Sequence, residues 1–139
     1  MPIQRIPYSE LNSRQRENYN FQKLAAILAD YGFNCIKLSD DWQGADFLAY
    51  HIDGINTLRV QLKGRMSIDR KYIGKNLHMA FPSCGDWYLI DHDHLVQIVS
   101  KHTNWLNTSS WIDNGIYNSD APSKILRDAL KEFRIESTA

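Results

Sequence analysis

Three polar side chains in the first half of the sequence are of the types that hold a divalent cation beside a phosphate. Asp46 precedes an Asp53-Gly54 pair, and Gln61 and Lys63 follow it. Carboxylate and amide oxygens are ligands for a hard cation such as Mg²⁺, and an ammonium group attracts a phosphate. If the fold brings the three side chains together, they can form a metal and phosphate site.

The elements that must position these side chains are two short strands joined by a turn. Residues 47–52 and 57–62 are rich in aromatic, aliphatic and β-branched side chains, and an Asp-Gly pair between such runs favours a hairpin. A two-residue loop puts Asp46 opposite Gln61, and a four-residue loop puts it opposite Lys63. All three share one face in both registers, because opposed residues point the same way. A three-residue loop would send Asp46 to the other face.

This pattern resembles the active-site signature of the PD-(D/E)XK nuclease superfamily. There an Asp begins one strand and an acid-x-Lys lies on its antiparallel neighbour. Gln61 stands here in place of the acid, and this Gln-x-Lys form is similar to that of Mrr-type restriction nucleases and some intron-encoded homing endonucleases. The segment 31–65 fits as well, with Gly32-Phe33 ending a helix and residues 35–38 forming a first strand. The resemblance implies a restriction-endonuclease-like α/β fold, in which helices flank a central mixed sheet of about four strands.

The function that the resemblance implies is a metal-dependent endonuclease that hydrolyses DNA phosphodiester bonds with Mg²⁺ or Mn²⁺. Asp46 would anchor the metal, Gln61 would offer its amide oxygen, and Lys63 would orient or deprotonate the attacking water. A Gln in place of Glu removes one negative charge, which weakens metal affinity unless another acid contributes. The same replacement leaves open an alternative, a nuclease-derived domain that binds nucleic acid or a protein without cutting.

Glu17 is the best candidate for the additional acid. A helix predicted over residues 13–31 carries apolar side chains at steps of three and four, and Glu17 continues their stripe one turn earlier. It is therefore expected to face the sheet, and many members of the resembled superfamily carry a metal-linked Glu on this helix. Alternatively, Glu17 favours the helix dipole and pairs with Arg14 or Arg16 on the surface.

Basic residues gather in the segment that follows the predicted hairpin. The chain has 16 Lys and Arg against 16 Asp and Glu, and a net charge of zero argues against nonspecific coating of nucleic acid. A local cluster still determines where a phosphate backbone docks. The expected DNA contacts are Arg65, Arg70, Lys71 and Lys75. For any one of them, a solvated surface position is an equally good interpretation.

Composition indicates one globular domain over residues 1–139, with 43% hydrophobic residues and no apolar run long enough to span a membrane. No apolar stretch follows the N-terminus as in a signal peptide, so a cytoplasmic location is expected. Cys35 and Cys84 form neither a zinc motif nor a disulfide framework, and both are expected to be core thiols. Cleavage of both DNA strands would favour a homo-oligomer, a dimer or a tetramer.

The second half of the chain carries fewer functional signals. Strands are predicted over residues 76–81 and 86–90, and Asp91 or Asp93 is expected to cap a helix that runs to Val99. The run Asp91-His92-Asp93-His94 has the residue types of a metal site. Adjacent side chains diverge, however, and capping accounts for the acids.

Aromatic residues mark the last third of the sequence. The segment 104–120 contains Trp105, Trp111 and Tyr117, and it is expected to contact nucleic acid or a second subunit, or to cover the edge of the core. A final helix is predicted over residues 122–134, with Pro122 in its first turn.

Overall fold

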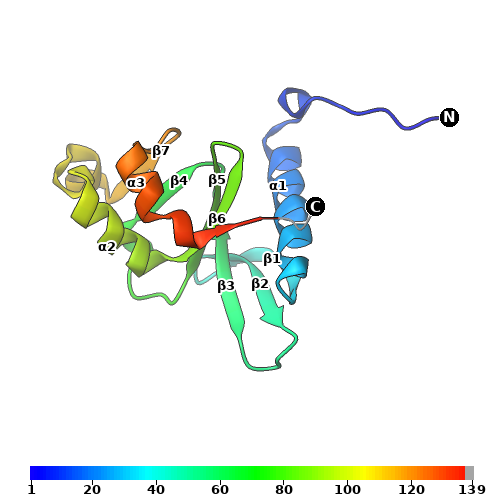
Figure 1. Cartoon of the computed structure of the whole chain (residues 1–139), viewed down its shortest axis with the longest axis horizontal. Helices are drawn as coiled ribbons and strands as arrows, with labels where there is room; N and C mark the ends of the chain where they lie inside the picture. The colour runs from blue at the N-terminus through cyan, green and yellow to red at the C-terminus, as the bar shows by residue number, and fades with distance from the viewer. Residues whose placement is uncertain (137–139) are drawn as a thin grey trace.

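The computed structural model describes residues 1–136, and Figure 1 shows how their helices and strands are arranged. The helices are α1 (Ser13–Asp30), α2 (His92–His102) and α3 (Lys124–Ala129). The strands are β1 (Phe33–Trp42), β2 (Ala45–His51), β3 (Thr57–Leu62), β4 (Met66–Asp69), β5 (His78–Ser83), β6 (Asp86–Asp91), β7 (Ile116–Ser119) and β8 (Arg134–Ile135).

Helix α1 forms where the apolar spacing predicted it, and its first residue is set by a reciprocal cap. The Asn12 side chain accepts a hydrogen bond from the Gln15 amide, while the Gln15 side chain accepts one from the Asn12 amide. Two amides that no helical carbonyl can reach are thereby satisfied. After the helix, Gly32 adopts a φ of 85°, which glycine tolerates and which turns the chain into β1.

The main sheet has six strands in the order β1-β2-β3-β5-β6-β8, so the expected number of about four was too low. Strands β3 and β5 are parallel and the other neighbours are antiparallel, which makes the sheet mixed, as expected. The crossover from β3 to β5 contains β4, which pairs with β7 in a separate two-stranded sheet.

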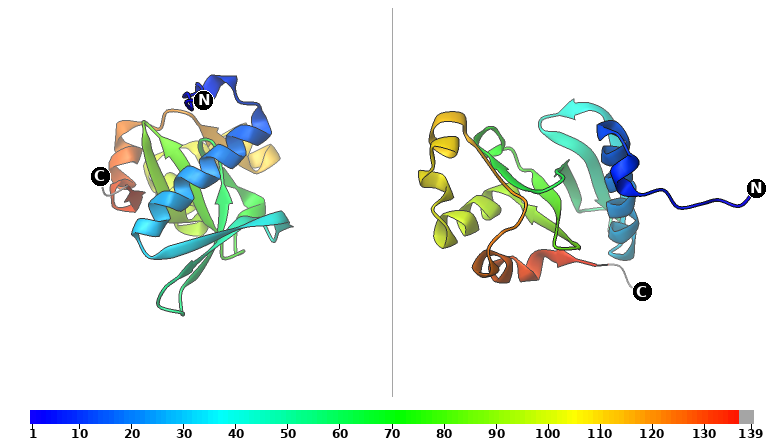
Figure 2. Two further views of the ribbon diagram at one scale, coloured as in Figure 1. Left: turned by 90° about the vertical axis from the view of Figure 1, so that its right-hand side faces the viewer. Right: turned by 90° about the horizontal axis from the view of Figure 1, so that it is seen from above.

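The main sheet buries side chains on both faces, and this produces three layers (Figures 1 and 2). Helix α1 crosses one face, where Leu24 and Leu28 pack with Phe47 and Val60. Helices α2 and α3 and the small sheet cover the other face, whose core includes Phe81. Burial of apolar surface at about 25 cal/mol per Å² holds the layers together.

The β2–β3 hairpin has the register expected for a two-residue loop. Phe47 lies opposite Val60, and the next step along the ladder puts Asp46 opposite Gln61. The connection itself is longer, because the strands stop at His51 and Thr57. The Asp53 carboxylate holds this connection by accepting hydrogen bonds from the amides of Ile55 and Asn56, at 2.8 and 2.9 Å.

The final helix is shorter than predicted. It starts after Ser123, whose hydroxyl accepts a hydrogen bond from the Leu126 amide, and Ile125 on the expected apolar face is 65% exposed. The chain then turns into β8, which pairs with Trp87 and Tyr88 of β6. Helical periodicity alone did not reveal this strand, because two residues at a sheet edge leave no repeat in the sequence.

The aromatic side chains of the segment 104–120 pack at the edge of the core, which is one of the roles expected for this segment. Trp105 is buried, and its ring stacks on Tyr117 with centroids 4.3 Å apart, while Trp111 packs against the same cluster. Of the two cysteines, Cys35 is half-buried and Cys84 is exposed, so the prediction of a core thiol was wrong for Cys84. Across residues 1–136, no helix is both long and apolar enough to cross a membrane.

Candidate functional site

Asp46 occupies the second position of β2, at the wall of a cavity of about 440 Å³. Its Oδ2 accepts a hydrogen bond from the Leu62 amide at 2.9 Å, which ties it to the end of β3. Glu17 on α1 lines the same cavity from the helix side, and Asp41 lines it from the end of β1. The hairpin and the first helix thus bring Asp46 and Glu17 to one space, and we call this space the Asp46 cavity.

The Asp46 carboxyl is held in an environment that disfavours its charge. Burial raises its pKa above the ordinary value, and the negative charges of Glu17 and Asp41 raise it further. The hydrogen bond from Leu62 and the positive charge of Lys63 act in the opposite direction. A cation placed between these acids would relieve their repulsion, because opposite charge favours the ionised form.

The turn before Asp46 depends on Gly44. Its φ is 89°, and a Cβ built there would lie 2.6 Å from a methyl carbon of Leu77 and 3.2 Å from the Tyr72 ring. Its amide donates to the Asp41 carboxylate at 2.7 Å. The backbone at Gly44 therefore packs closely against the core side chains Leu77 and Tyr72. This contact positions the start of β2.

We predict that Gly44→Ala destabilises the protein by about 2 to 4 kcal/mol, because a positive φ and a steric clash act together. Chemical denaturation with circular dichroism would measure the loss. The control is Gly54→Ala, where φ is also positive at 72° but no atom lies within 4 Å of the added Cβ. It should cost only about 1 to 2 kcal/mol. Equal losses would show that the Leu77 contact is irrelevant.

Gln61 lies opposite Asp46 and is 7% exposed. Its Nε2 makes one long contact of 3.5 Å with the Leu62 carbonyl, whereas no described residue donates a hydrogen bond to its buried Oε1. Leaving a buried acceptor unpaired costs about 1 to 3 kcal/mol, so native proteins rarely do so without a reason. The unpaired atom is a neutral oxygen, the ligand type that a hard divalent cation accepts.

Lys63 follows β3, and its amide continues the ladder by donating to the Ala80 carbonyl at 2.9 Å. Its Nζ lies 5.9 Å from the centroid of Tyr72, a ring that is itself buried. Lys63 lines a second cavity with Ser67 and Asn118 rather than the Asp46 cavity. The structure thus places Lys63 close enough for its charge to lower the pKa of Asp46, although Lys63 does not line the Asp46 cavity.

Two of the predicted DNA contacts are engaged within the protein. Arg65 forms an ion pair with Asp120, in which Nη1 lies 3.3 Å from Oδ1. Arg70 donates from Nη2 to the carbonyls of Trp111 and Ile112 and lies 5.5 Å from the Trp111 ring centroid. Arg70 therefore holds the segment of Trp111 in place, and the structure gives it a structural role that sequence could not show.

The other two predicted contacts flank the turn at Gly44. Lys71 and Lys75 line a cavity with Asp41 and Tyr72, on the side where that turn is exposed. Lys71 makes an ion pair with Asp69 at 3.8 Å, although its own side chain is 67% exposed. Lys75 is exposed and forms no ion pair with any residue between 1 and 136. The ammonium group of Lys75 is therefore open to a phosphate, whereas that of Lys71 would meet a phosphate beside its partner Asp69, which is buried.

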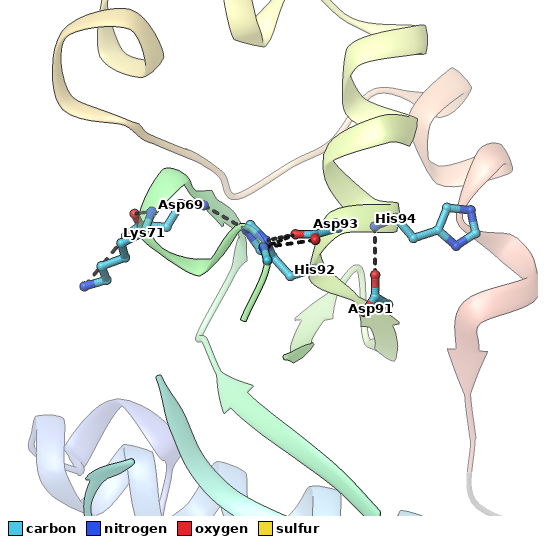
Figure 3. A network of polar contacts seen from close by, with 7 residues as sticks. Asp69, Lys71, Asp91, His92, Asp93 and His94 are labelled. Atoms are coloured by element: carbon cyan, nitrogen blue, oxygen red, sulfur yellow. Dashed lines mark hydrogen bonds and ion pairs between the residues drawn. The ribbon is translucent and has the colours of Figure 1, made fainter. Parts of the chain in front are cut away.

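The run from Asp91 to His94 serves the fold, as its capping interpretation predicted (Figure 3). The Asp91 carboxylate accepts from the His94 amide at 3.0 Å and starts α2. His92 is 1% exposed, and its Nε2 accepts from the Asp69 amide at 3.1 Å. Burial lowers its pKa, so the ring is neutral at neutral pH. Asp93 accepts from the Gly74 amide and its Oδ1 lies 3.4 Å from the Nδ1 of His92, while the His94 ring points away from both, so the four side chains do not converge on one point.

In the described residues, carboxylate, imidazole and thiol side chains do not by themselves form a metal site. Within the part of the chain that the structure describes, no three His, Cys, Asp or Glu side chains lie together as metal ligands. Glutamine is outside that set, and Gln61 lies on the strand position opposite Asp46 but is not among the residues that line the Asp46 cavity. Asp41 was not among the predicted site residues, although it lies five residues before Asp46, at the turn that positions it.

Comparisons with known proteins give one structural similarity. A bacterial homing endonuclease, I-Ssp6803I, superimposes with a TM-score of 0.46 and 15% sequence identity, over 61% of this chain and 69% of that one. No protein-family model matches the chain, and no curated protein matches it. The similarity to the homing endonuclease is too low to assign a family.

Proposed function

We propose that this protein is a metal-dependent endonuclease of the PD-(D/E)XK type that hydrolyses DNA phosphodiester bonds. The observation that carries the proposal is the buried Oε1 of Gln61, which lies unpaired on the strand position opposite Asp46. A buried acceptor without a protein partner is typical of a position that meets a water or a ligand, and this supports a ligand role for the oxygen. The donor set of carboxylate and amide oxygens fits Mg²⁺ or Mn²⁺.

Each residue of the proposed site has a separate task. Asp46, Gln61 and Glu17 would hold the metal, which when bound supplies Lewis-acid stabilisation of the negative charge on the scissile phosphate. Lys63 attracts that phosphate and orients or deprotonates the water. As a charged ammonium it can attract the phosphate and orient the water through its three donors, whereas deprotonation of the water requires the neutral amine, after the ammonium has lost a proton to solvent. The Leu62 amide holds Asp46 in place by binding Oδ2, which leaves Oδ1 for the metal.

The direct test is to incubate the purified protein with supercoiled plasmid, linear duplex and branched DNA in Mg²⁺ or Mn²⁺. We expect nicks that are absent when the metal is chelated. DNA binding without any nicking would favour the alternative function, a nuclease-derived binding domain. The neutral Gln61 is the feature that favours this alternative, because it contributes less to metal affinity than an acid does.

We predict that Gln61→Glu lowers the Mg²⁺ concentration needed for half-maximal cleavage by about tenfold, because a carboxylate replaces a neutral oxygen in the same position. Metal titration of the initial cleavage rate would report the change. The matched control is Gln97→Glu, at an exposed position on α2 in the far helical layer. If Gln61→Glu is folded and active with an unchanged metal requirement, Gln61 does not bind the metal.

We predict that replacing Lys71 and Lys75 together by Ala flattens the plot of log affinity against log salt by about two units, at roughly 0.9 per phosphate contact on duplex DNA. The loss should be similar on unrelated sequences, because phosphate contacts carry no base information. Anisotropy in Ca²⁺ would measure binding without cleavage. Lys124→Ala with Lys131→Ala, on the far helical layer, is the control that should leave the slope unchanged. An unaltered slope for the first pair would mean that DNA docks elsewhere.

A further inference from the structure

A groove of about 650 Å³ lies beside α1, on a different side of that helix from the Asp46 cavity. One wall comes from α1, another from the turn between β5 and β6, and a third from the segment before α1. Its lining is largely aromatic and apolar. The lining includes Tyr8, Tyr19, Lys23, Gly64, Pro82 and Trp87. We call it the Tyr19 groove.

The groove presents exposed aromatic rings that the fold holds in fixed positions. Tyr8 and Tyr19 are 42% and 41% exposed, and their rings meet edge to face with centroids 5.2 Å apart. Asn20 fixes the first ring by donating from Nδ2 to the Tyr8 hydroxyl at 3.0 Å. Trp87 lines the groove from β6 and is itself anchored by the pairing of β6 with β8. Exposing such rings is unfavourable, so the groove offers apolar area to a ligand.

Positive charge accompanies these rings. The Nζ of Lys23 lies 5.4 Å from the Tyr19 centroid, and the guanidinium of Arg16 lies 5.2 Å from the Tyr8 centroid. Aromatic faces with neighbouring cations are the combination by which proteins bind single-stranded nucleic acid, because each base stacks on a ring while a cation meets the backbone. A continuous duplex cannot use the rings, since its bases are already stacked on one another.

The groove adjoins the proposed active site at one residue. Gly64 lines the Tyr19 groove and also the cavity that contains Lys63, its immediate neighbour in the chain. Gly64 has no side chain, and no atom lies within 4 Å of the position where its Cβ would be, so the surface at this shared residue is unobstructed. A DNA strand with its phosphate at Lys63 can therefore continue into the groove.

We propose that the Tyr19 groove binds unpaired nucleotides of a DNA strand next to the scissile phosphate, which makes a substrate with a single-stranded segment, such as a flap, the preferred one. The assignment of this strand as substrate rests on the proposed nuclease function. The stacking of unpaired bases in the groove does not depend on it. Binding and cleavage can therefore be tested separately.

The test measures binding of a labelled oligo-dT and of a hairpin duplex of equal length to the Asp46→Asn protein in chelator, so that cleavage cannot interfere. We expect the single strand to bind more tightly. Tyr19→Ala should weaken oligo-dT binding by about fivefold or more and leave the duplex unaffected, as expected for loss of one stacking ring. The matched control is Tyr50→Ala on the β2–β3 hairpin, where the ring is 40% exposed and lies outside the groove.

A second readout locates the bases. Oligo-dT should quench tryptophan fluorescence, and Trp87→Phe should remove most of that quenching, whereas Trp42→Phe on β1 should not. Trp42 is a suitable comparison because it is 51% exposed and does not line the groove. This readout remains informative if Tyr19→Ala alters the packing of Tyr8.

Three results would overturn the proposal. The first is that the duplex competes for the protein as well as oligo-dT does, and the second is that Tyr19→Ala leaves the affinity for oligo-dT unchanged. The third is that sedimentation shows a concentration-dependent dimer that Tyr19→Ala abolishes. The last would assign the groove to a second copy of the chain. Absence of cleavage together with oligo-dT binding that needs Tyr19 would overturn the nuclease function and retain the groove as a single-strand site.

Discussion

Asp46→Asn is expected to reduce DNA cleavage by about a thousandfold or more, because a metal-held site supplies several kcal/mol of transition-state stabilisation and Asp46 is its charged anchor. The same variant should be more stable than the wild type at neutral pH. Burial, Glu17 and Asp41 raise the pKa of Asp46, so ionisation of this carboxyl group lowers the stability of the folded protein. Plasmid nicking and urea denaturation would measure the two effects.

The pH dependence follows from the direction of this pKa shift. Below the ordinary Asp pKa of 3.8, wild type and variant are both uncharged at this position and should be equally stable. As pH rises through 3.8 toward the raised value in the folded protein, the wild type should lose stability relative to Asp46→Asn. A gain of stability together with loss of activity is typical of residues retained for function.

Asp53 provides the matched control in the same hairpin. Hydrogen bonds from the Asn56 and Ile55 amides hold its pKa at about 2, so its carboxylate contributes stability at pH values above 3.8. That contribution is lost as pH falls through about 2. Asp53→Asn should therefore destabilise the protein at neutral pH and leave cleavage unchanged.

Full activity in Asp46→Asn would show that Asp46 is not a metal ligand.

Lys63→Met should reduce the single-turnover cleavage rate by about a hundredfold while DNA affinity falls only slightly. Met keeps the apolar stem near Tyr72, so the change removes the charge and its proton chemistry, which contribute about 10²-fold or more when a positioned group acts on a reacting atom. Loss of one phosphate contact changes the salt slope of binding by about 0.9. Rapid quench in Mg²⁺ and anisotropy in Ca²⁺ would separate rate from affinity.

Lys75→Met is the companion variant, since this lysine is exposed and lies on the far side of the Gly44 turn from the Asp46 cavity. It should weaken binding by a similar amount and leave the rate on saturated DNA unchanged. Equal rate losses in both variants would mean that Lys63 serves only to bind DNA. An unchanged rate in Lys63→Met would remove it from the proposed chemistry.

Local patterns predicted the elements that surround the site. Helix α1 has the predicted start because Asn12 and Gln15 are three residues apart, the distance that a reciprocal cap requires. The Asp53-Gly54 pair and strand alternation predicted the hairpin with two possible registers, and the structure has the one that puts Asp46 opposite Gln61. The Asp91 cap was likewise readable from its place before an apolar helical stretch. In each case the interacting groups lie close together in the sequence.

Tertiary structure decided which charged residues are free to act. Arg70 and Lys75 look alike in the sequence, yet Arg70 is bound to carbonyls more than forty residues away, at Trp111 and Ile112, and Lys75 is exposed. The burial of Gln61 was equally hidden, because it depends on a distant segment, strand β5, whose Met79 lies beside Gln61 in the sheet. Periodicity reports which face a residue occupies, and it does not report what covers that face.

By itself, then, the sequence determined the candidate residues, the strands that carry them and the face they share, since these follow from spacing along one chain segment. Only the tertiary structure left the Oε1 of Gln61 without a partner, brought Glu17 and Asp41 to the wall of the Asp46 cavity, and opened a groove at Gly64. Those features arise from contacts between segments distant in the chain. The physical reason is that desolvation, repulsion between charges and steric fit depend on neighbours in space, which local sequence does not specify.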